Sequence, residues 1–140
     1  AIASVGGFDP RFFLYYEDAD LFRRLRTEGF DLLLSGSAVA RHERGGTWSD
    51  PAQRQAAAFR GAVLYHHKHG GAGAGFAYRA GLLFLYAPRL CFGGLVSGIL
   101  GRRSIFTARD RLRLLGSTVR IVFSAEGWRS AGVADGGGTP

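Results

Sequence analysis

Three carboxylates lie close together near the start of the chain, where they could take part in acid–base chemistry. Glu17, Asp18 and Asp20 follow two tyrosines and open a run whose apolar residues recur at helical spacing, which predicts a helix over residues 17–28. Exposed backbone N–H groups and the helix dipole stabilise negative charge in the first turn of a helix. A carboxylate that stays ionised there can act as a general base. The same residues could instead only stabilise the helix start, so this pattern leaves both interpretations open.

Histidines at two places could bind a metal or a phosphate. His42 follows a short apolar run, and it is either a metal ligand or an ordinary surface histidine. The run 65–69, Tyr-His-His-Lys-His, places His66 and His69 on one helix face, but no carboxylate or cysteine lies nearby in sequence. It could bind a metal, contact a phosphate or an acceptor, or form a solvated basic helix end.

The elements around the carboxylates are short. Gly6-Gly7 predicts a turn, since glycine permits backbone angles that other residues resist. Gly29 is in the position where glycine commonly ends a helix. The apolar runs 30–34 and 38–41 are bounded by turn-forming residues and predict two strands.

The second half of the chain has a different pattern. Asp50 and Pro51 form a typical helix start, which predicts a helix to about residue 69. Residues 70–75 are nearly all glycine and alanine and predict a flexible joint. Residues 80–100 carry one charge, so they could span a membrane, lie on its surface as a helical hairpin, or pack against another domain.

A last helix is predicted over residues 108–123, with Thr107 as its N-cap. One face carries an apolar stripe and the next an arginine stripe, a pattern typical of helices at a membrane interface. The apolar residues are Leu112, Leu115, Val119 and Val122, and the arginines are Arg109, Arg113 and Arg120.

Charge is unevenly distributed along the 140 residues, whose net charge is +7. Residues 1–59 are nearly balanced, whereas residues 60–129 hold ten arginines and one lysine against two acidic residues. The basic half suits an anionic membrane surface or a nucleic acid. Cys91 is the only cysteine, which excludes an internal disulfide framework.

Residues 6–21, from Gly-Gly-Phe-Asp through an aromatic run to Glu-Asp-Ala-Asp-Leu, resemble a signature of family 2 glycosyltransferases, closest to rhamnosyltransferase-like and galactofuranosyltransferase-like members. An arginine in the next turn, Gly29 and His42 continue the pattern, which covers about a third of the chain. The resemblance implies an α/β fold. We therefore expect the C-terminal part of a GT-A domain, without its nucleotide-binding half, followed by a helical, apolar and basic extension.

The resemblance also implies roles for individual residues. Asp18 would be the general base, while Glu17 and Asp20 would orient the acceptor or brace the loop. His42 would help to bind a divalent metal, Mg²⁺ or Mn²⁺, that assists departure of the nucleotide diphosphate. The acceptor loop would consist of Gly6, Gly7, Phe8 and Asp9.

The expected organisation is a catalytic-base part over residues 1–69, a membrane-associating helical part over 76–128, and a disordered tail over 129–140. The parent enzyme would perform inverting transfer of a sugar, such as rhamnose, from a nucleotide-diphospho-sugar donor to a lipid-linked or cell-envelope glycan acceptor. We expect it at the cytoplasmic face of the membrane, and we expect this chain alone to be inactive. The alternatives are a non-catalytic membrane anchor and a nucleic-acid-binding module. The chain has no recognisable nucleic-acid-binding motif, so no nucleic acid partner is expected.

Overall fold

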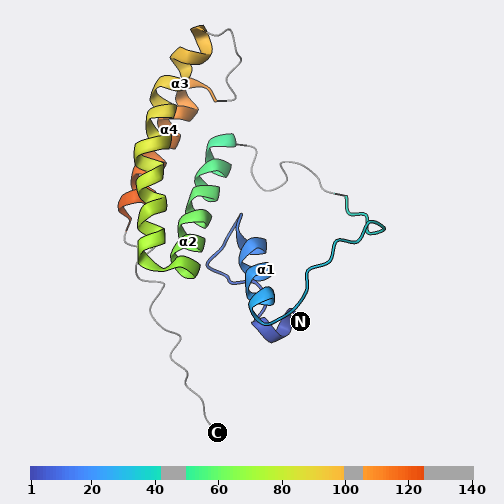
Figure 1. The fold of residues 1–140 in the computed structure, drawn as a ribbon. Coiled ribbons are helices and arrows are strands. Elements are labelled where there is room, and N and C mark those ends of the chain that lie inside the picture. The colour runs from blue at the N-terminus through green and yellow to red at the C-terminus, as the bar shows by residue number, and fades with distance from the viewer. Residues whose placement is uncertain (42–49, 100–105, 125–140) are drawn as a thin grey trace.

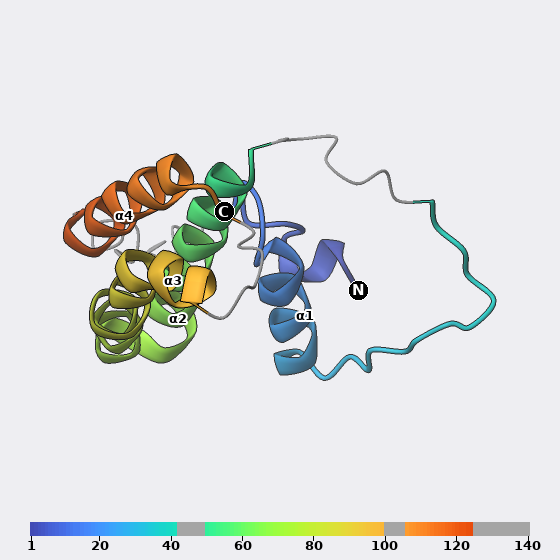
Figure 2. The same cartoon turned by 90° about the horizontal axis from the view of Figure 1, so that it is seen from above.

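The computed structural model describes residues 1–41, 50–99 and 106–124, and every regular element within them is helical (Figure 1). A central helix, α2, has α1 on one side and the pair α3 and α4 on the other, as both views show (Figures 1 and 2). The helices are the 3₁₀ turn η1 (Ala3–Val5), α1 (Glu17–Thr27), α2 (Pro51–Gly81), the π-helical turn η2 (Leu82–Tyr86), α3 (Ala87–Ile99) and α4 (Ala108–Phe123).

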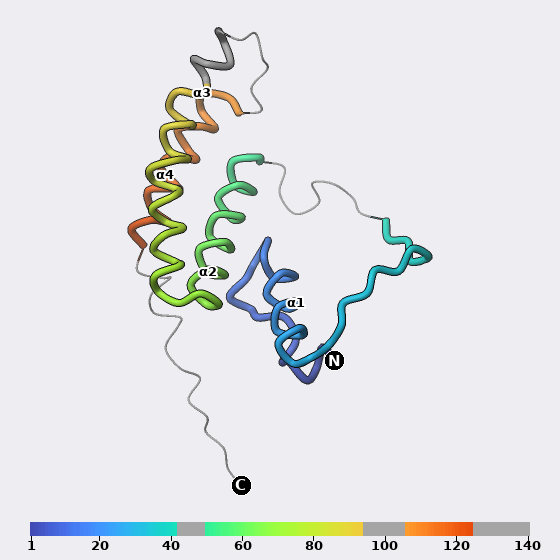
Figure 3. The backbone as a smooth tube through the Cα atoms, in the orientation of Figure 1, coloured from blue at the N-terminus to red at the C-terminus, as the bar shows by residue number. Residues whose placement is uncertain are grey.

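The predicted α/β fold class is therefore wrong for the described part of the chain. Residues 30–34 and 38–41 form no strand and run away from the helices as an extended coil (Figure 3). Leu34 is 100% exposed and Val39 94% exposed. A strand needs a neighbour that accepts and donates its backbone hydrogen bonds, and no described segment offers one here. Apolar composition alone thus predicted strands that the local environment does not support.

Helix α2 reverses direction at Gly71. This residue has φ 76° and ψ −176°, which breaks the helix into two arms that return side by side. A Cβ on Gly75 would lie 3.0 Å from the Cβ of His67, so the arms approach closely just after the turn. Glycine is needed at Gly71 because a side chain is strained at this positive φ. The flexible joint predicted over residues 70–75 is instead this turn between two helical arms.

The second arm of α2 continues through η2 into α3 without leaving the helical path. Pro88 lies just after the π-helical turn. Proline cannot donate the i−4 hydrogen bond, and a π-type turn is one way in which a helix accommodates such a break. Within the described residues, no helix combines the length and the apolar character needed to cross a membrane.

One apolar cluster joins both arms of α2 to η2, α3 and α4. Its members come from residues on either side of the Gly71 turn, and Leu114 at its centre is completely buried. Burial of such side chains is the main source of stability in a helical assembly. The buried members are Ala52, Phe59, Val63, Leu82, Leu90, Leu114 and Ile121.

Helix α4 begins and ends where the sequence predicts, but its predicted apolar stripe is only partly buried: Leu115 and Val122 pack against the core, whereas Leu112 and Val119 are exposed. The Thr107 hydroxyl accepts a hydrogen bond from the Asp110 N–H, which confirms the predicted N-cap. Leu112, a member of the predicted apolar stripe, is 71% exposed, whereas Leu114 and Ile121 face the core. The helix carries two overlapping apolar stripes, and periodicity cannot show which of them has a partner.

The C-terminal end of α4 is held by a buried arginine from α2. Arg79 donates hydrogen bonds to the carbonyls of Ile121, Val122 and Ser124 at 2.8–3.0 Å. Burial lowers the pKa of Arg79 from its ordinary value. A cation at this end of a helix compensates the carbonyls that lack intrahelical partners. Arg79 thus fixes α4 against the second arm of α2.

Candidate functional site

The backbone immediately before α1 is strained. Tyr15 and Tyr16 have φ angles of 68° and 69°, in the left-handed region that bulky residues rarely adopt. Tyr16 is the N-cap residue of α1 and offers no side-chain capping bond. Strained positions persist only where surrounding structure holds them, and they cluster at functional sites. The strain here lies directly next to Glu17 and Asp18.

Helix α2 holds this strained segment in place. A Cβ on Gly61 would lie 2.6 Å from the carbonyl oxygen of Tyr15, so only glycine allows this approach. The ring of Tyr16 packs on Tyr65, with 5.5 Å between the ring centroids. Burial, together with the neighbouring Tyr16 hydroxyl, raises the pKa of Tyr78 to about 12. Three residues of α2 therefore fix the tyrosine pair from which α1 starts.

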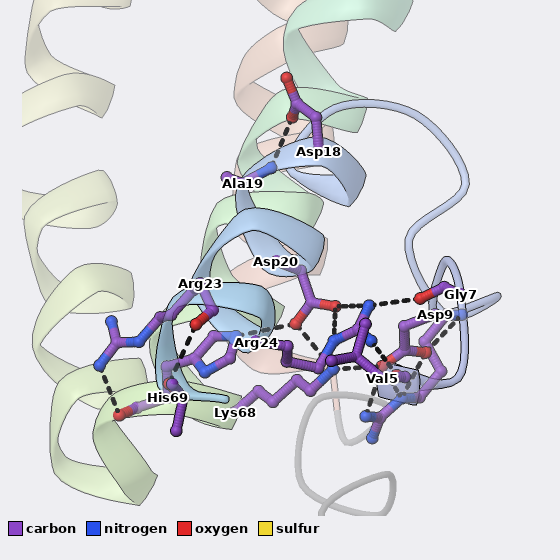
Figure 4. Close-up of polar contacts among 12 residues, drawn as sticks. Val5, Gly7, Asp9, Asp18, Ala19, Asp20, Arg23, Arg24, Lys68 and His69 are labelled. Carbon is purple, nitrogen blue, oxygen red and sulfur yellow. Dashed lines mark hydrogen bonds and ion pairs between the residues drawn. The ribbon is translucent and has the colours of Figure 1, made fainter. Parts of the chain in front are cut away.

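The three predicted carboxylates have different environments. Asp18 is exposed at the N-terminal end of α1, and its Oδ1 accepts a hydrogen bond from the Ala19 N–H at 2.8 Å. Oε2 of Glu17 is buried without a hydrogen-bond partner among the described residues. Asp20 is 0% exposed. Figure 4 shows Asp18 pointing away from the cluster that surrounds Asp20. Asp18 is thus the carboxylate that an acceptor in solution could reach.

Asp20 is the centre of a buried ion-pair cluster. Its carboxylate lies 2.8 Å from Arg24, 2.7 Å from Lys68 and 2.8 Å from His69 (Figure 4). Burial raises the pKa of Asp20, but the hydrogen bonds from Lys68, His69 and Arg24 outweigh burial and hold the pKa below its ordinary value. For His69, burial lowers the pKa and the hydrogen bond to Asp20 raises it. Burial has the larger effect, so the pKa of His69 lies below its ordinary value. The cluster ties α1 to the end of the first arm of α2.

The glycine loop is joined to the same cluster. Lys68 also lies 2.7 Å from Asp9, which pairs with Arg11 at 2.7 Å. The Arg11 hydrogen bond is the main reason that the pKa of Asp9 falls far below its ordinary range. Arg24 donates to the carbonyl oxygen of Gly7 at 2.7 Å and to that of Val5.

The structure therefore brings some of the predicted site residues together. Lys68 links Asp9 to Asp20, and Arg24 connects Asp20 to Gly7. Gly6 and Gly7 adopt positive φ angles of 76° and 71°, and Phe8 between this turn and Asp9 is exposed. His42 lies outside the described residues.

Several residues that build this site were not predicted. Lys68 and His69 lie in the run noted for its histidines, but their partner Asp20 is 48 or more positions away in sequence. Tyr65 opens the same run but was given no role, and Gly61 gave no signal at all. His66 stacks on Tyr78 with 4.8 Å between ring centroids. The residues of this run therefore have partners, which the sequence pattern alone could not identify.

The described residues do not provide a metal site by themselves. No three His, Cys, Asp or Glu side chains are grouped closely enough within residues 1–41, 50–99 and 106–124 to hold an ion. Asp20 is already surrounded by three cationic or hydrogen-bonding partners. His42, the metal ligand implied by the resemblance, lies outside these residues, so the divalent metal stays a prediction.

Comparison with known proteins supports a glycosyltransferase-like function. The chain is 39% identical over 69 residues to N-acetylglucosaminyl-diphospho-decaprenol L-rhamnosyltransferase from two strains of Mycobacterium tuberculosis, CDC 1551 / Oshkosh and ATCC 25618 / H37Rv. The similarity covers 49% of this chain and spans a fifth of the length of these relatives. No family model and no solved structure matches the chain. The resemblance seen in residues 6–21 is thus supported at the level of glycosyltransferases.

Proposed function

We propose that this chain carries the general base of an inverting glycosyltransferase. The proposed reaction moves a sugar from a nucleotide-diphosphate donor to a lipid-linked or cell-envelope glycan acceptor. Its finer features come from the relatives, which are named as rhamnosyltransferases that act on a diphospho-decaprenol-linked sugar. Rhamnose as the donor sugar and a polyprenyl-diphosphate-linked acceptor are therefore part of the proposal.

The observation that carries the proposal is the contrast between Asp18 and its neighbours. Asp18 is exposed at a helix N-terminus, and Oδ1 alone is engaged, by the adjacent backbone N–H. Asp20, two residues later, is buried and bound by cationic side chains, and these contacts hold α1 against α2. A base must be both accessible to the acceptor and held in a constant position. Asp18 meets these two requirements.

In the proposed mechanism, an acceptor hydroxyl attacks the anomeric carbon of the donor sugar from the face opposite the leaving group. Asp18 takes the hydroxyl proton as the new carbon–oxygen bond forms. The bond from the anomeric carbon to the diphosphate breaks, and its electron pair leaves with the nucleotide diphosphate.

The divalent metal implied by the resemblance remains a proposal. Mg²⁺ or Mn²⁺, with His42 as a ligand, would supply a Lewis acid for the leaving diphosphate. The grouped ligands that such an ion needs are not assembled among the described residues, so we assign no step to it.

We also propose that the helical part contacts the cytoplasmic face of a membrane. The second arm of α2, η2 and α3 expose three phenylalanines, Phe76, Phe84 and Phe92, together with Leu85. Arg89 is exposed on α3. Exposed aromatic and aliphatic side chains next to basic residues suit the boundary between headgroups and acyl chains.

The proposal is tested by the substitution Asp18→Asn in the full-length product of the gene that encodes this chain. Sugar transfer from a nucleotide-diphosphate donor to a polyprenyl-diphosphate-linked acceptor should fall by about 100-fold or more, the contribution expected of a general base. Glu28→Gln is the matched control, because Glu28 is an exposed carboxylate at the other end of the same helix region. It should retain wild-type transfer. If the Asp18→Asn variant transferred sugar at the wild-type rate, the result would favour the alternative that this chain is a non-catalytic membrane anchor.

A further inference from the structure

A large cavity opens on the side of α2 that faces α4. Its volume is about 1340 Å³, and its walls come from residues 11–14, the first arm of α2 with Arg79 from the second, and the C-terminal half of α4. Pockets for compact metabolites have volumes of about 300 to 1,000 Å³. This cavity is therefore large enough for a ligand longer than a simple sugar or phosphate.

The charged lining of the cavity is strongly basic. Five arginines line it against one aspartate, Asp50. Arg113 is the arginine paired with Asp50, at 3.6 Å. Arg60 and Arg120 are exposed and make no ion pair or hydrogen bond with another described residue. Positive charge that no described residue compensates can attract an anion, and guanidinium groups match phosphate oxygens in geometry.

Apolar side chains line the same cavity. Phe13 is 77% exposed and Phe123 is 73% exposed, and Leu14 and Leu64 lie in the same wall. Aromatic rings exposed to water gain free energy when an apolar ligand covers them. The cavity thus combines a surface for an anion with a surface for a hydrocarbon.

We propose that this cavity binds a polyisoprenyl diphosphate, with the diphosphate on Arg60 and Arg120 and the first isoprene units on Phe13 and Phe123. A free diphosphate would leave the aromatic rings in water, and a neutral lipid would leave the arginines without an anion. A lipid diphosphate satisfies both parts of the lining. This inference rests on the proposed function and deepens it, since it identifies the site that holds the acceptor by its lipid end.

The test is a binding titration of the 140-residue protein with three soluble probes. Isothermal titration calorimetry would compare farnesyl diphosphate, inorganic pyrophosphate and farnesol, each below its aggregation concentration. We expect farnesyl diphosphate to bind at least about tenfold more tightly than either of the other two, because it alone makes both sets of contacts. Pyrophosphate that binds as tightly as farnesyl diphosphate would overturn the lipid assignment and point to a free phosphate or to the donor.

Two sets of variants separate the two halves of the site. The double substitution Arg60→Gln and Arg120→Gln should weaken binding of farnesyl diphosphate by about tenfold or more. The double substitution Phe13→Ala and Phe123→Ala should weaken farnesyl diphosphate but leave pyrophosphate binding unchanged. All four side chains are largely exposed, so the fold should persist, which circular dichroism would check.

Arg109→Gln is the matched control for charge. Arg109 is exposed on the same helix as Arg120 but does not line the cavity. Equal losses for Arg109→Gln and for the arginine pair would show attraction to net positive charge and would overturn the site. Failure here is distinct from failure of the proposed function, because binding is measured without a donor and does not depend on the role of Asp18. If farnesyl diphosphate does not bind but sugar transfer still depends on Asp18, only the assignment of the cavity is wrong.

Discussion

The two regions on either side of the first arm of α2 are held by different forces. Helix α1 and the loop before it are tied to α2 through Asp9, Asp20, Lys68 and His69, at distances of 2.7–2.8 Å. The other region, both arms of α2 with α3 and α4, shares an apolar cluster to which residues 1–41 contribute nothing. The candidate base therefore belongs to a region that is joined to α2 by charge as well as by the packing of Tyr16 on Tyr65. The arginine-lined cavity lies mainly on helices that are positioned by apolar packing.

This difference has consequences for stability. Ion pairs that are partly or fully buried depend on every partner, because removal of one leaves the others uncompensated. Apolar packing instead depends on volume and responds little to pH. We therefore expect substitutions that remove a charge to release α1 without unfolding the other helices. Substitutions that reduce core volume should destabilise those other helices more than α1.

The largest effect should come from Asp20→Ala. The substitution leaves Arg24, Lys68 and His69 without their shared anion, and the loss of one partner of a buried ion pair costs about 3 to 5 kcal/mol. Hydrogen exchange should show that amides of α1 lose protection while those of α4 keep it. Asp31→Ala, at an exposed position, is the control and should change neither. Equal loss of protection in α1 and α4 would mean that the two regions unfold as one.

Next in size is a pair of leucine substitutions on α4. Leu114→Ala removes a completely buried side chain and should lower the free energy of unfolding by about 3 kcal/mol. Leu112→Ala, two positions earlier and largely exposed, should change it by less than about 0.5 kcal/mol. Denaturant unfolding measures both. If Leu112→Ala lowered the free energy of unfolding more than Leu114→Ala, the face with Leu112 would be the buried one, which would contradict the observed core.

A smaller effect is expected from alanine at Gly61. Its Cβ would lie 2.6 Å from the Tyr15 carbonyl oxygen, so Gly61→Ala should push the strained loop away and cost about 2 kcal/mol. Gly116→Ala on α4 meets no atom within 4 Å and should stabilise that helix by up to about 1 kcal/mol. In thermal unfolding, the midpoint temperature should fall for Gly61→Ala and rise for Gly116→Ala. Equal shifts at the two glycines would mean that the Tyr15 contact is not tight.

The smallest effect should be a loss of α1 protection between pH 7 and pH 5. The pKa of His69 is lowered in the folded protein by burial, so its contribution is complete above the unfolded value of about 6.5 and falls below it. Asp9 and Asp20 have lowered pKa values, so their contribution is present above about pH 4 and is lost only at lower pH. His69→Gln should remove the slope between pH 7 and pH 5. A slope that survives this substitution would assign the effect to another group.

Local features of the fold could be predicted from the sequence, and long-range features could not. The N-caps Asp50 and Thr107 and the turn at Gly71 depend on neighbouring residues, and the helices start and reverse close to the predicted positions. The strands predicted over 30–34 and 38–41 were wrong, because a strand depends on a partner that the local pattern does not reveal.

The candidate site divides in the same way. The position of Asp18 at a helix start followed from the residues around it, whereas its exposure was not predicted. The burial of Asp20 did not, because its partners Lys68 and His69 lie on another helix. Glu17, Asp18 and Asp20 look alike in the sequence, and only tertiary contacts give them different environments.

The most direct test of the central claim measures transfer and stability together for two neighbouring substitutions, Asp18→Asn and Asp20→Asn. In the full-length gene product, we expect Asp18→Asn to reduce sugar transfer by about 100-fold or more and to change the free energy of unfolding by less than about 1 kcal/mol, because among the described residues its side chain contacts only its own helix turn. Asp20→Asn should lower the free energy of unfolding. A variant at Asp18 that transfers sugar at the wild-type rate would contradict the assignment of the base.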